Sequence, residues 1–157
     1  GDFPSNTTGW TASTALTKNH DSSRGFVALG ALQFEFVRNG GHGGQVAISQ
    51  SISGFSAGQY FHAVAYVCRE SNFNQTLDEV YLDVQAGSDH YSSPLIPFGD
   101  IPIKDTGDWA LLECTGQLPA ATTSVTFRVY ANVATTPAVV TFIYLDDCSL
   151  YVTGSKT

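Results

Sequence analysis

Residues 124–130 read SVTFRVY, a segment in which apolar and polar side chains alternate strictly. The two sets are Val125, Phe127 and Val129 on one side, and Thr126, Arg128 and Tyr130 on the other. Successive side chains of a strand point to opposite faces, so this period of two predicts a half-buried β-strand. The apolar set would face a core and the polar set would face solvent.

The same pattern recurs along the chain and predicts its architecture. Further segments with alternating or continuous apolar character are 31–37, 46–52, 60–68, 80–84, 109–118 and 139–152. None shows a 3.6-residue apolar stripe, and only 70–79 has room for a short helical turn. Segments 39–44 and 87–107, rich in Gly and Pro, are predicted loops. We therefore predict a single all-β domain over residues 1–157, an antiparallel β-sandwich of two sheets with almost no helix.

Composition excludes two classes of partner. The 157 residues include only seven Lys plus Arg, and the formal net charge is −7, which argues against binding to nucleic acid. No apolar run approaches the length of a membrane span, so none is expected. Charged residues make up 13% of the chain, and a polar but weakly charged surface is common among secreted proteins. We expect an extracellular location.

The three cysteines are Cys68, Cys114 and Cys148, separated by 46 and 34 residues (114 − 68 and 148 − 114). These spacings lack the clustered ligands of a zinc site. An odd number leaves at least one cysteine without a partner in the chain. Buried free thiols are expected, with room for at most one disulfide.

The pentapeptide GFSAG, residues 54–58, matches the G-x-S-x-G pattern of a nucleophile elbow. That motif requires a helix after the serine, whereas this stretch lies between two predicted strands. Ser56 is therefore interpreted as a turn residue, and His62 as a packed, hydrogen-bonded histidine. The candidate acids for glycoside hydrolysis, Glu35, Glu70, Glu79 and Glu113, show no pairing along the sequence. We expect no enzymatic activity.

The order of several motifs resembles the carbohydrate-binding modules of families 4, 9, 16 and 22. The motifs are GDFPSNTTGW, QSISGFSAGQYFHAVAYV, DWALLECTGQLPA, SVTFRVY and FIYLDDCSLY, and together they extend over nearly the whole chain. The resemblance implies a galactose-binding-like jelly roll that binds a polysaccharide or glycan and is appended to other domains. The same fold serves in phage tails and surface fibres, so the alternative is a structural or adhesion domain of a larger assembly.

The resemblance also implies a structural calcium site. Asp146 matches the family's aspartate ligand, and the backbone carbonyl of Asp2 matches a second ligand. The family's glutamate after the phenylalanine of the opening motif is replaced here by Pro4, which offers no side-chain oxygen. Two interpretations stay open: Asp146 binds calcium, or it only caps a turn or meets an amide.

Sugar-binding surfaces stack aromatic rings on pyranose faces and surround them with polar side chains. The outward residues Arg128 and Tyr130, followed by Asn132, meet this description, and the resemblance places ligand contacts on this strand. Tyr81 and Asp83 show the same pattern on segment 80–84. They would join the first group only if both strands belong to one sheet.

Other aromatic residues are interpreted as core or as an alternative site. Trp10, Trp109 and Tyr60 align with core aromatics of the family and are expected to be packed. The face of segment 60–68 that would carry a platform is small and apolar: Phe61, Ala63, Ala65 and Val67. The alternative site lies in the two predicted loops, which carry His42, His90, Tyr91 and Phe98.

Overall fold

The structure is a computed structural model that describes residues 9–12, 16–21, 31–36, 44–70, 79–133 and 141–153. Side chains are described over 9–12, 46–70, 79–132 and 143–153. Residues 39–43 of the predicted loop with His42, the segment 71–78 and Asp2 lie outside these ranges, whereas Gly44, the last residue of that loop, begins a strand.

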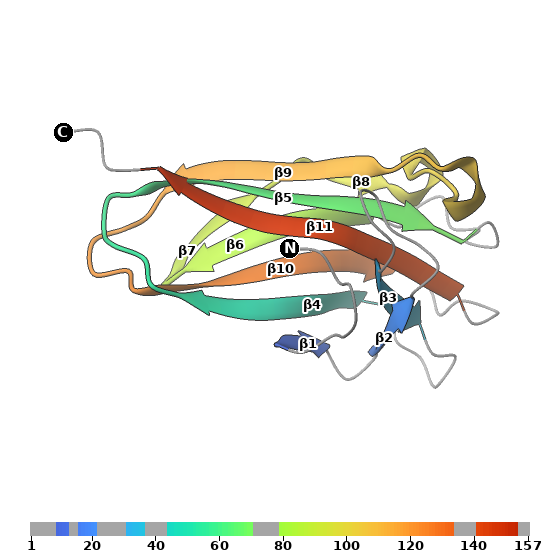
Figure 1. The fold of residues 1–157 in the computed structure, drawn as a ribbon, viewed down its shortest axis with the longest axis horizontal. Coiled ribbons are helices and arrows are strands. Elements are labelled where there is room, and N and C mark those ends of the chain that lie inside the picture. Colours follow the sequence, from blue (N-terminus) through green and yellow to red (C-terminus); the bar gives the residue numbers. More distant parts are fainter. Residues whose placement is uncertain are drawn as a thin grey trace.

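The chain forms two sheets packed face to face (Figure 1). Sheet A has the order β1 (Trp10–Ala12), β4 (Gly44–Ser53), β10 (Ser124–Val133), β6 (Glu79–Ala86) and β7 (Asp89–Ser92), with β8 (Ile96–Pro97) also on β6. Sheet B has the order β2 (Leu16–Asp21), β3 (Ala31–Phe36), β11 (Thr141–Thr153), β5 (Tyr60–Arg69) and β9 (Ala110–Gln117). The strand pairs within both sheets are antiparallel, which confirms the predicted β-sandwich. The described residues include two short 3₁₀ turns, η1 (Phe98–Asp100) and η2 (Lys104–Thr106), and no helix long and apolar enough to cross a membrane.

The core lies between the sheets and is filled by the apolar set of each alternating strand. Buried members include Ile48, Phe61, Ala63, Ala65, Val67, Val80, Leu82, Val84, Leu112, Val125, Phe127, Val129, Ile143 and Leu145. Trp10 meets Phe127 edge to face, with ring centroids 5.9 Å apart, so its predicted core role is confirmed. Full burial of one such side chain contributes roughly 1.5–3 kcal/mol.

Several side chains of β5 are placed differently from the prediction. Phe61 and the small residues after it face the core rather than a binding surface, because β5 begins with Tyr60 on the outer face of sheet B. The prediction of a core Tyr60 is therefore wrong: this residue is 42% exposed. His62 is hydrogen-bonded, as expected, but its side chain is half exposed. Trp109 is partly buried, and it packs outside the main core on Cys68 and Tyr144.

A β-bulge interrupts β11. Asp146 pairs with Tyr66 and Ser149 pairs with Val64, so two residues of β11 lie opposite one residue of β5. Asp147 adopts a φ of 43°, in the left-handed region that Asp tolerates better than most residues. The extra residue turns Cys148 into the core. All three cysteines are buried thiols, and no disulfide forms among them.

The GFSAG stretch is a turn between β4 and β5. Gly54 and Gly58 have φ angles of 97° and 76°, which favour glycine. The backbone N–H of Ser56 donates to the Oε1 atom of Gln59 at 2.8 Å, and β5 follows directly. No helix follows Ser56, so a nucleophile elbow is excluded.

The prediction that 87–107 is a loop is wrong in its first part. Gly87, with a φ of 64°, opens a two-residue turn between β6 and β7. The ring of Tyr91 in β7 meets that of Phe61 edge to face at 5.1 Å, and its hydroxyl donates to the carbonyl of Gln117 at 2.5 Å. Phe98, a candidate of the loop site, is fully buried in the core.

Candidate functional site

The outer face of sheet A, meaning the side turned away from sheet B, brings the predicted ligand-binding residues together. Strands β6 and β10 are neighbours in this sheet, so Tyr81 and Asp83 join the group of Arg128, Tyr130 and Asn132. Tyr81 lies directly opposite Tyr130, and Asp83 lies directly opposite Arg128. Asn132 lies one pair further along, opposite Glu79. The five residues therefore form one continuous patch.

Two tyrosines form the centre of this patch. The rings of Tyr81 and Tyr130 are stacked, with centroids 5.0 Å apart and an interplanar angle of 22°. On the other neighbouring strand, β4, the residue opposite Tyr130 is Ala47, which has a small side chain. The side chain of Tyr130 is partly exposed. Burial, followed by the nearby Tyr130, Asp83 and Glu79, raises the pKa of Tyr81, which keeps its phenol neutral.

Arg128 is held in place beside the tyrosine pair. Its Nη1 atom donates to the hydroxyl of Tyr130 at 3.2 Å, and Nη2 donates to the side-chain oxygen of Gln85. The same Nη1 atom lies 3.8 Å from Oδ2 of Asp83. A guanidinium that is fixed at several points loses less entropy when it binds a ligand.

Asp83 points to the predicted face but is not exposed there. Its exposed fraction is 2%, because three neighbours cover it. Ser92 Oγ donates to Oδ1 at 3.0 Å, and the Nδ1 atom of His90 lies 3.1 Å from Oδ2. Arg128 approaches from the other side. Asp83 therefore lies beneath the surface on which a ligand would rest.

Asn132 ends the patch on the other side of the tyrosines. Its Nδ2 atom donates to Oε1 of Glu79 at 2.8 Å. Both side chains are partly exposed, so their remaining polar atoms are available to hydroxyl groups. Glu79 joins the patch only through this pairing, which the sequence does not reveal.

Sequence reasoning placed His90 in a loop rather than in this patch. The structure puts it on β7, next to β6, with its side chain half exposed. The segment DHYS is four residues long, too short to show a clear alternation. The signal that could have located it is the Ala-Gly-Ser-Asp stretch at 86–89, a glycine-containing hairpin turn.

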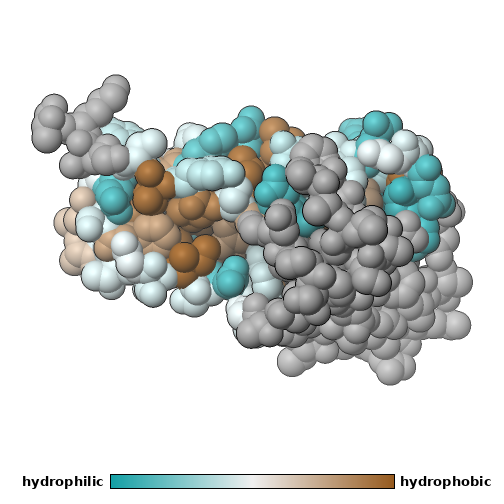
Figure 2. Space-filling model, in the orientation of Figure 1, coloured by the Kyte–Doolittle hydropathy of each residue, from teal (hydrophilic) through white to brown (hydrophobic). Residues whose placement is uncertain are grey.

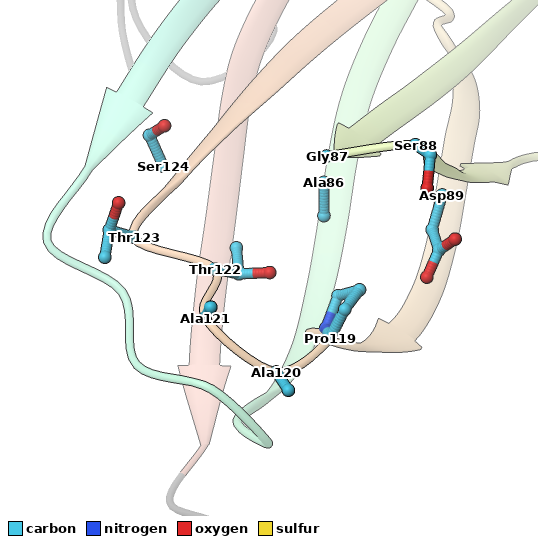
Figure 3. Close-up of a pocket in the computed structure, with 10 residues that line it drawn as sticks. All are labelled: Ala86, Gly87, Ser88, Asp89, Pro119, Ala120, Ala121, Thr122, Thr123 and Ser124. Atoms are coloured by element: carbon cyan, nitrogen blue, oxygen red, sulfur yellow. The ribbon is translucent and has the colours of Figure 1, made fainter.

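A cavity of about 300 Å³ lies elsewhere, between the β6–β7 turn and the segment joining β9 to β10 (Figure 3). It is lined by small residues such as Ala86, Pro119 and Thr122, with Asp89 as its single charged residue. Its lining contains no aromatic ring on which a sugar could stack. The cavity is therefore a poorer candidate than the outer face of sheet A.

The outer face of sheet B carries a different surface, which Figure 2 shows as a group of apolar atoms outside the grey region. Its exposed apolar residues include Tyr60, Leu111 and Tyr151. His62 and Glu113 form a hydrogen bond of 3.0 Å beside them. This face supplies matched control positions for the first surface.

The calcium expectation depends on Asp2 and Asp146. Asp146 precedes the bulge of β11 and is 1% exposed, so its carboxylate is inside the protein. Calcium prefers oxygen ligands of this kind, six to eight in number. The described part of the chain contains no group of three or more His, Cys, Asp or Glu that could hold a metal.

Comparisons with known proteins identify solved structures with a similar fold. No protein-family model and no curated protein sequence matches the chain. Among solved structures, the CBM22-1 xylan-binding domain of Paenibacillus barcinonensis Xyn10C matches with a TM-score of 0.67 and 14% identity, over 99% of this chain and 92% of that one. The CBM22-1–GH10 modules of Clostridium thermocellum Xyn10B match with a TM-score of 0.69 and 12% identity, over 98% of this chain and 28% of that one.

A third similar structure comes from a different setting. The enzymatically active domain of tailspike protein 4 of bacteriophage CBA120 matches with a TM-score of 0.62 and 11% identity, over 93% of this chain and 20% of that one. At these identities the likeness establishes a shared fold. It confirms that the sequence resemblance reflects the β-sandwich of carbohydrate-binding modules.

Proposed function

We propose that this domain is a non-catalytic carbohydrate-binding module that binds a neutral polysaccharide on the outer face of sheet A. The observation that carries the proposal is the stacked pair of Tyr81 and Tyr130 beside the fixed guanidinium of Arg128. An aromatic ring offers an apolar face to a pyranose, and the guanidinium donates to its hydroxyl groups. The fold shared with xylan-binding domains supports a pyranose chain as the ligand class.

The charges on this face favour a neutral glycan. The positive charge of Arg128 is balanced by Asp83 beneath it, and Glu79 adds a further negative charge. The whole chain carries a net charge of −7. The negative net charge of the domain would repel a polyanionic glycan, whereas it would neither attract nor repel a neutral one.

The setting of the domain is part of the proposal. One similar structure joins such a module to a GH10 module in a single enzyme. We expect this domain likewise to be appended to other domains of a secreted protein, where it would hold its parent on a polysaccharide. Calcium, if it binds through Asp146 and the carbonyl of Asp2, would stabilise the fold away from the glycan.

Affinity electrophoresis in gels with soluble xylan, β-glucan or galactomannan tests the function. We expect at least one polysaccharide to retard the wild-type domain, with or without chelator. Arg128→Ala should abolish much of the retardation, while His62→Ala on sheet B should retain it. Migration of the wild-type domain unaffected by every polysaccharide would contradict the proposal, and equal loss in both variants would contradict the location of the site.

A second candidate is a structural or adhesion domain of a larger assembly. The similar domain in a phage tailspike favours it, and so do the exposed Leu111 and Tyr151 on the outer face of sheet B. This function predicts that no glycan binds and that the outer face of sheet B becomes protected in the parent assembly. Hydrogen exchange of the domain alone and within its parent protein distinguishes the two.

A further inference from the structure

Asp83 is the most buried charged side chain of the candidate site, and it contacts three potential donors. The side chain is 3% exposed, compared with 50% for His90 and 22% for Arg128. His90 Nδ1 lies 3.1 Å from Oδ2 and 3.3 Å from Oδ1, and Ser92 Oγ donates to Oδ1 at 3.0 Å. Arg128 Nη1 lies 3.8 Å from Oδ2. The carboxylate thus faces donors from two strands that flank β6, namely β7 and β10.

The contact with Asp83 also fixes the ring of His90. An ionised carboxylate only accepts hydrogen bonds, so the nitrogen that faces it, Nδ1, must carry the hydrogen. In a neutral imidazole the other nitrogen, Nε2, is then an acceptor. The two nitrogens lie on different edges of the ring, so Nε2 does not take part in the contact with Asp83, and the side chain as a whole is half exposed.

The strand that carries His90 is itself held firmly. Its neighbour Tyr91 points to the opposite side, where its ring meets Phe61 and its hydroxyl donates to the carbonyl of Gln117. Strand β7 pairs with β6 from Asp83 to Ala86. His90 is therefore positioned by a strand and by a buried carboxylate, as a preorganised binding group requires.

We propose that Asp83 is a positioning residue of the candidate site: it fixes His90 and Arg128 so that Nε2 of His90 contacts the bound glycan. The inference rests on the proposed function and deepens it, since it assigns a hydrogen-bond acceptor to β7 and removes Asp83 from the ligand contacts. A sugar hydroxyl would donate to Nε2 while Arg128 donates to a neighbouring oxygen.

Two substitutions and their combination test the coupling, with isothermal titration of the tightest-binding glycan among soluble xylan, β-glucan and galactomannan. Asp83→Asn keeps the shape but replaces one acceptor by donors, and we expect it to weaken binding about 10- to 100-fold. His90→Ala should weaken binding about tenfold. Because Asp83 acts partly through His90, the effect of Asp83→Asn should be smaller in the His90→Ala background. Additive effects, or full affinity in a folded Asp83→Asn protein, would overturn the proposal.

A measurement without glycan separates positioning from a purely structural role. Nitrogen spectra of the imidazole rings should show hydrogen on Nδ1 of His90 in the wild type and a changed tautomer ratio in Asp83→Asn. Glu113→Gln, which alters the partner of His62 on sheet B, should leave His90 and the affinity unchanged. A lower melting temperature in Asp83→Asn with an unchanged His90 tautomer would show that Asp83 is only structural.

The glycan titration and the imidazole spectra together also distinguish a failure of this inference from a failure of the proposed function. If the wild-type domain binds none of the polysaccharides, the function and the glycan contact of His90 are both wrong. The ring spectra then still decide whether Asp83 positions His90.

Discussion

Replacing Tyr130 by alanine tests the aromatic centre of the candidate site. The substitution removes a partly exposed ring that stacks on the ring of Tyr81, with the two centroids 5.0 Å apart. It also removes the hydroxyl that accepts from Arg128 Nη1 at 3.2 Å. Both the surface for the sugar and one anchor of the guanidinium are lost together.

The magnitude follows from these two contacts. Loss of an aromatic contact at the centre of an interface costs on the order of 2 kcal/mol. Release of Arg128 adds up to about 1 kcal/mol. Binding should therefore weaken by roughly 2–3 kcal/mol, or about 30- to 150-fold. The fold should survive, because the stacked pair contributes only about 0.5–1.5 kcal/mol to stability.

Isothermal titration with the bound polysaccharide measures this change, and circular dichroism monitors the fold. Tyr130→Phe keeps the ring but loses the hydroxyl, so it should weaken binding by less than about tenfold. Tyr151→Ala is the matched control, because Tyr151 is 58% exposed on the outer face of sheet B. Unchanged affinity in a folded Tyr130→Ala protein, or equal losses in Tyr130→Ala and Tyr151→Ala, would refute the reasoning.

Three further predictions concern stability. A Cβ atom at Gly116 would clash with the ring of Tyr91 and lie 2.8 Å from that of Phe61. Gly116→Ala should therefore destabilise the domain by about 1–3 kcal/mol in urea unfolding, and an unchanged midpoint would contradict this. Burial raises the pKa of Cys114 to about 12 and that of Cys148 well above its usual 9, so the folded state retains protons that unfolded thiols lose. The free energy of unfolding should therefore fall as the pH rises above about 9, less steeply in Cys114→Ala, and equal slopes would contradict this. If calcium binds at Asp146, calcium at 100 times its dissociation constant should add about 2.7 kcal/mol to the free energy of unfolding and leave the glycan affinity unchanged. A melting temperature that changes neither with added calcium nor with chelator would exclude an occupied site.

The sequence predicted what depends on local pattern. Alternation at 80–84 and 124–130 located two strands and the faces that they bury, because burial of one side of a strand determines which residues point outward. It could not show that β6 and β10 are neighbours, since strand order depends on contacts between distant segments. The prediction that Tyr81 and Asp83 share a surface with Arg128 and Tyr130 therefore depended on that strand order, and the stacking of the two tyrosine rings was not predicted.

Other features could not be predicted from the alternation of residues, each for a specific reason. Asp83 has the outward position that alternation predicts, but its burial depends on His90 and Ser92 of a strand four residues long. Tyr60 was assigned to the core from the resemblance alone, and the register of β5 places it outside. The bulge after Asp146 shifts the alternation of inward and outward side chains in β11, and the sequence there does not indicate an extra residue.

Chemical-shift mapping of a glycan titration tests the central claim most directly. Backbone amide spectra would be recorded while the tightest-binding neutral oligosaccharide is added to the wild-type domain. The account predicts that the largest shifts fall on β10, β6, β7 and the adjoining part of β4, around Tyr130, Arg128 and His90. Shifts confined to β5, β9 and β11, or to the turn residues Gly87 and Ala120 that line the cavity, would contradict a binding site on the outer face of sheet A.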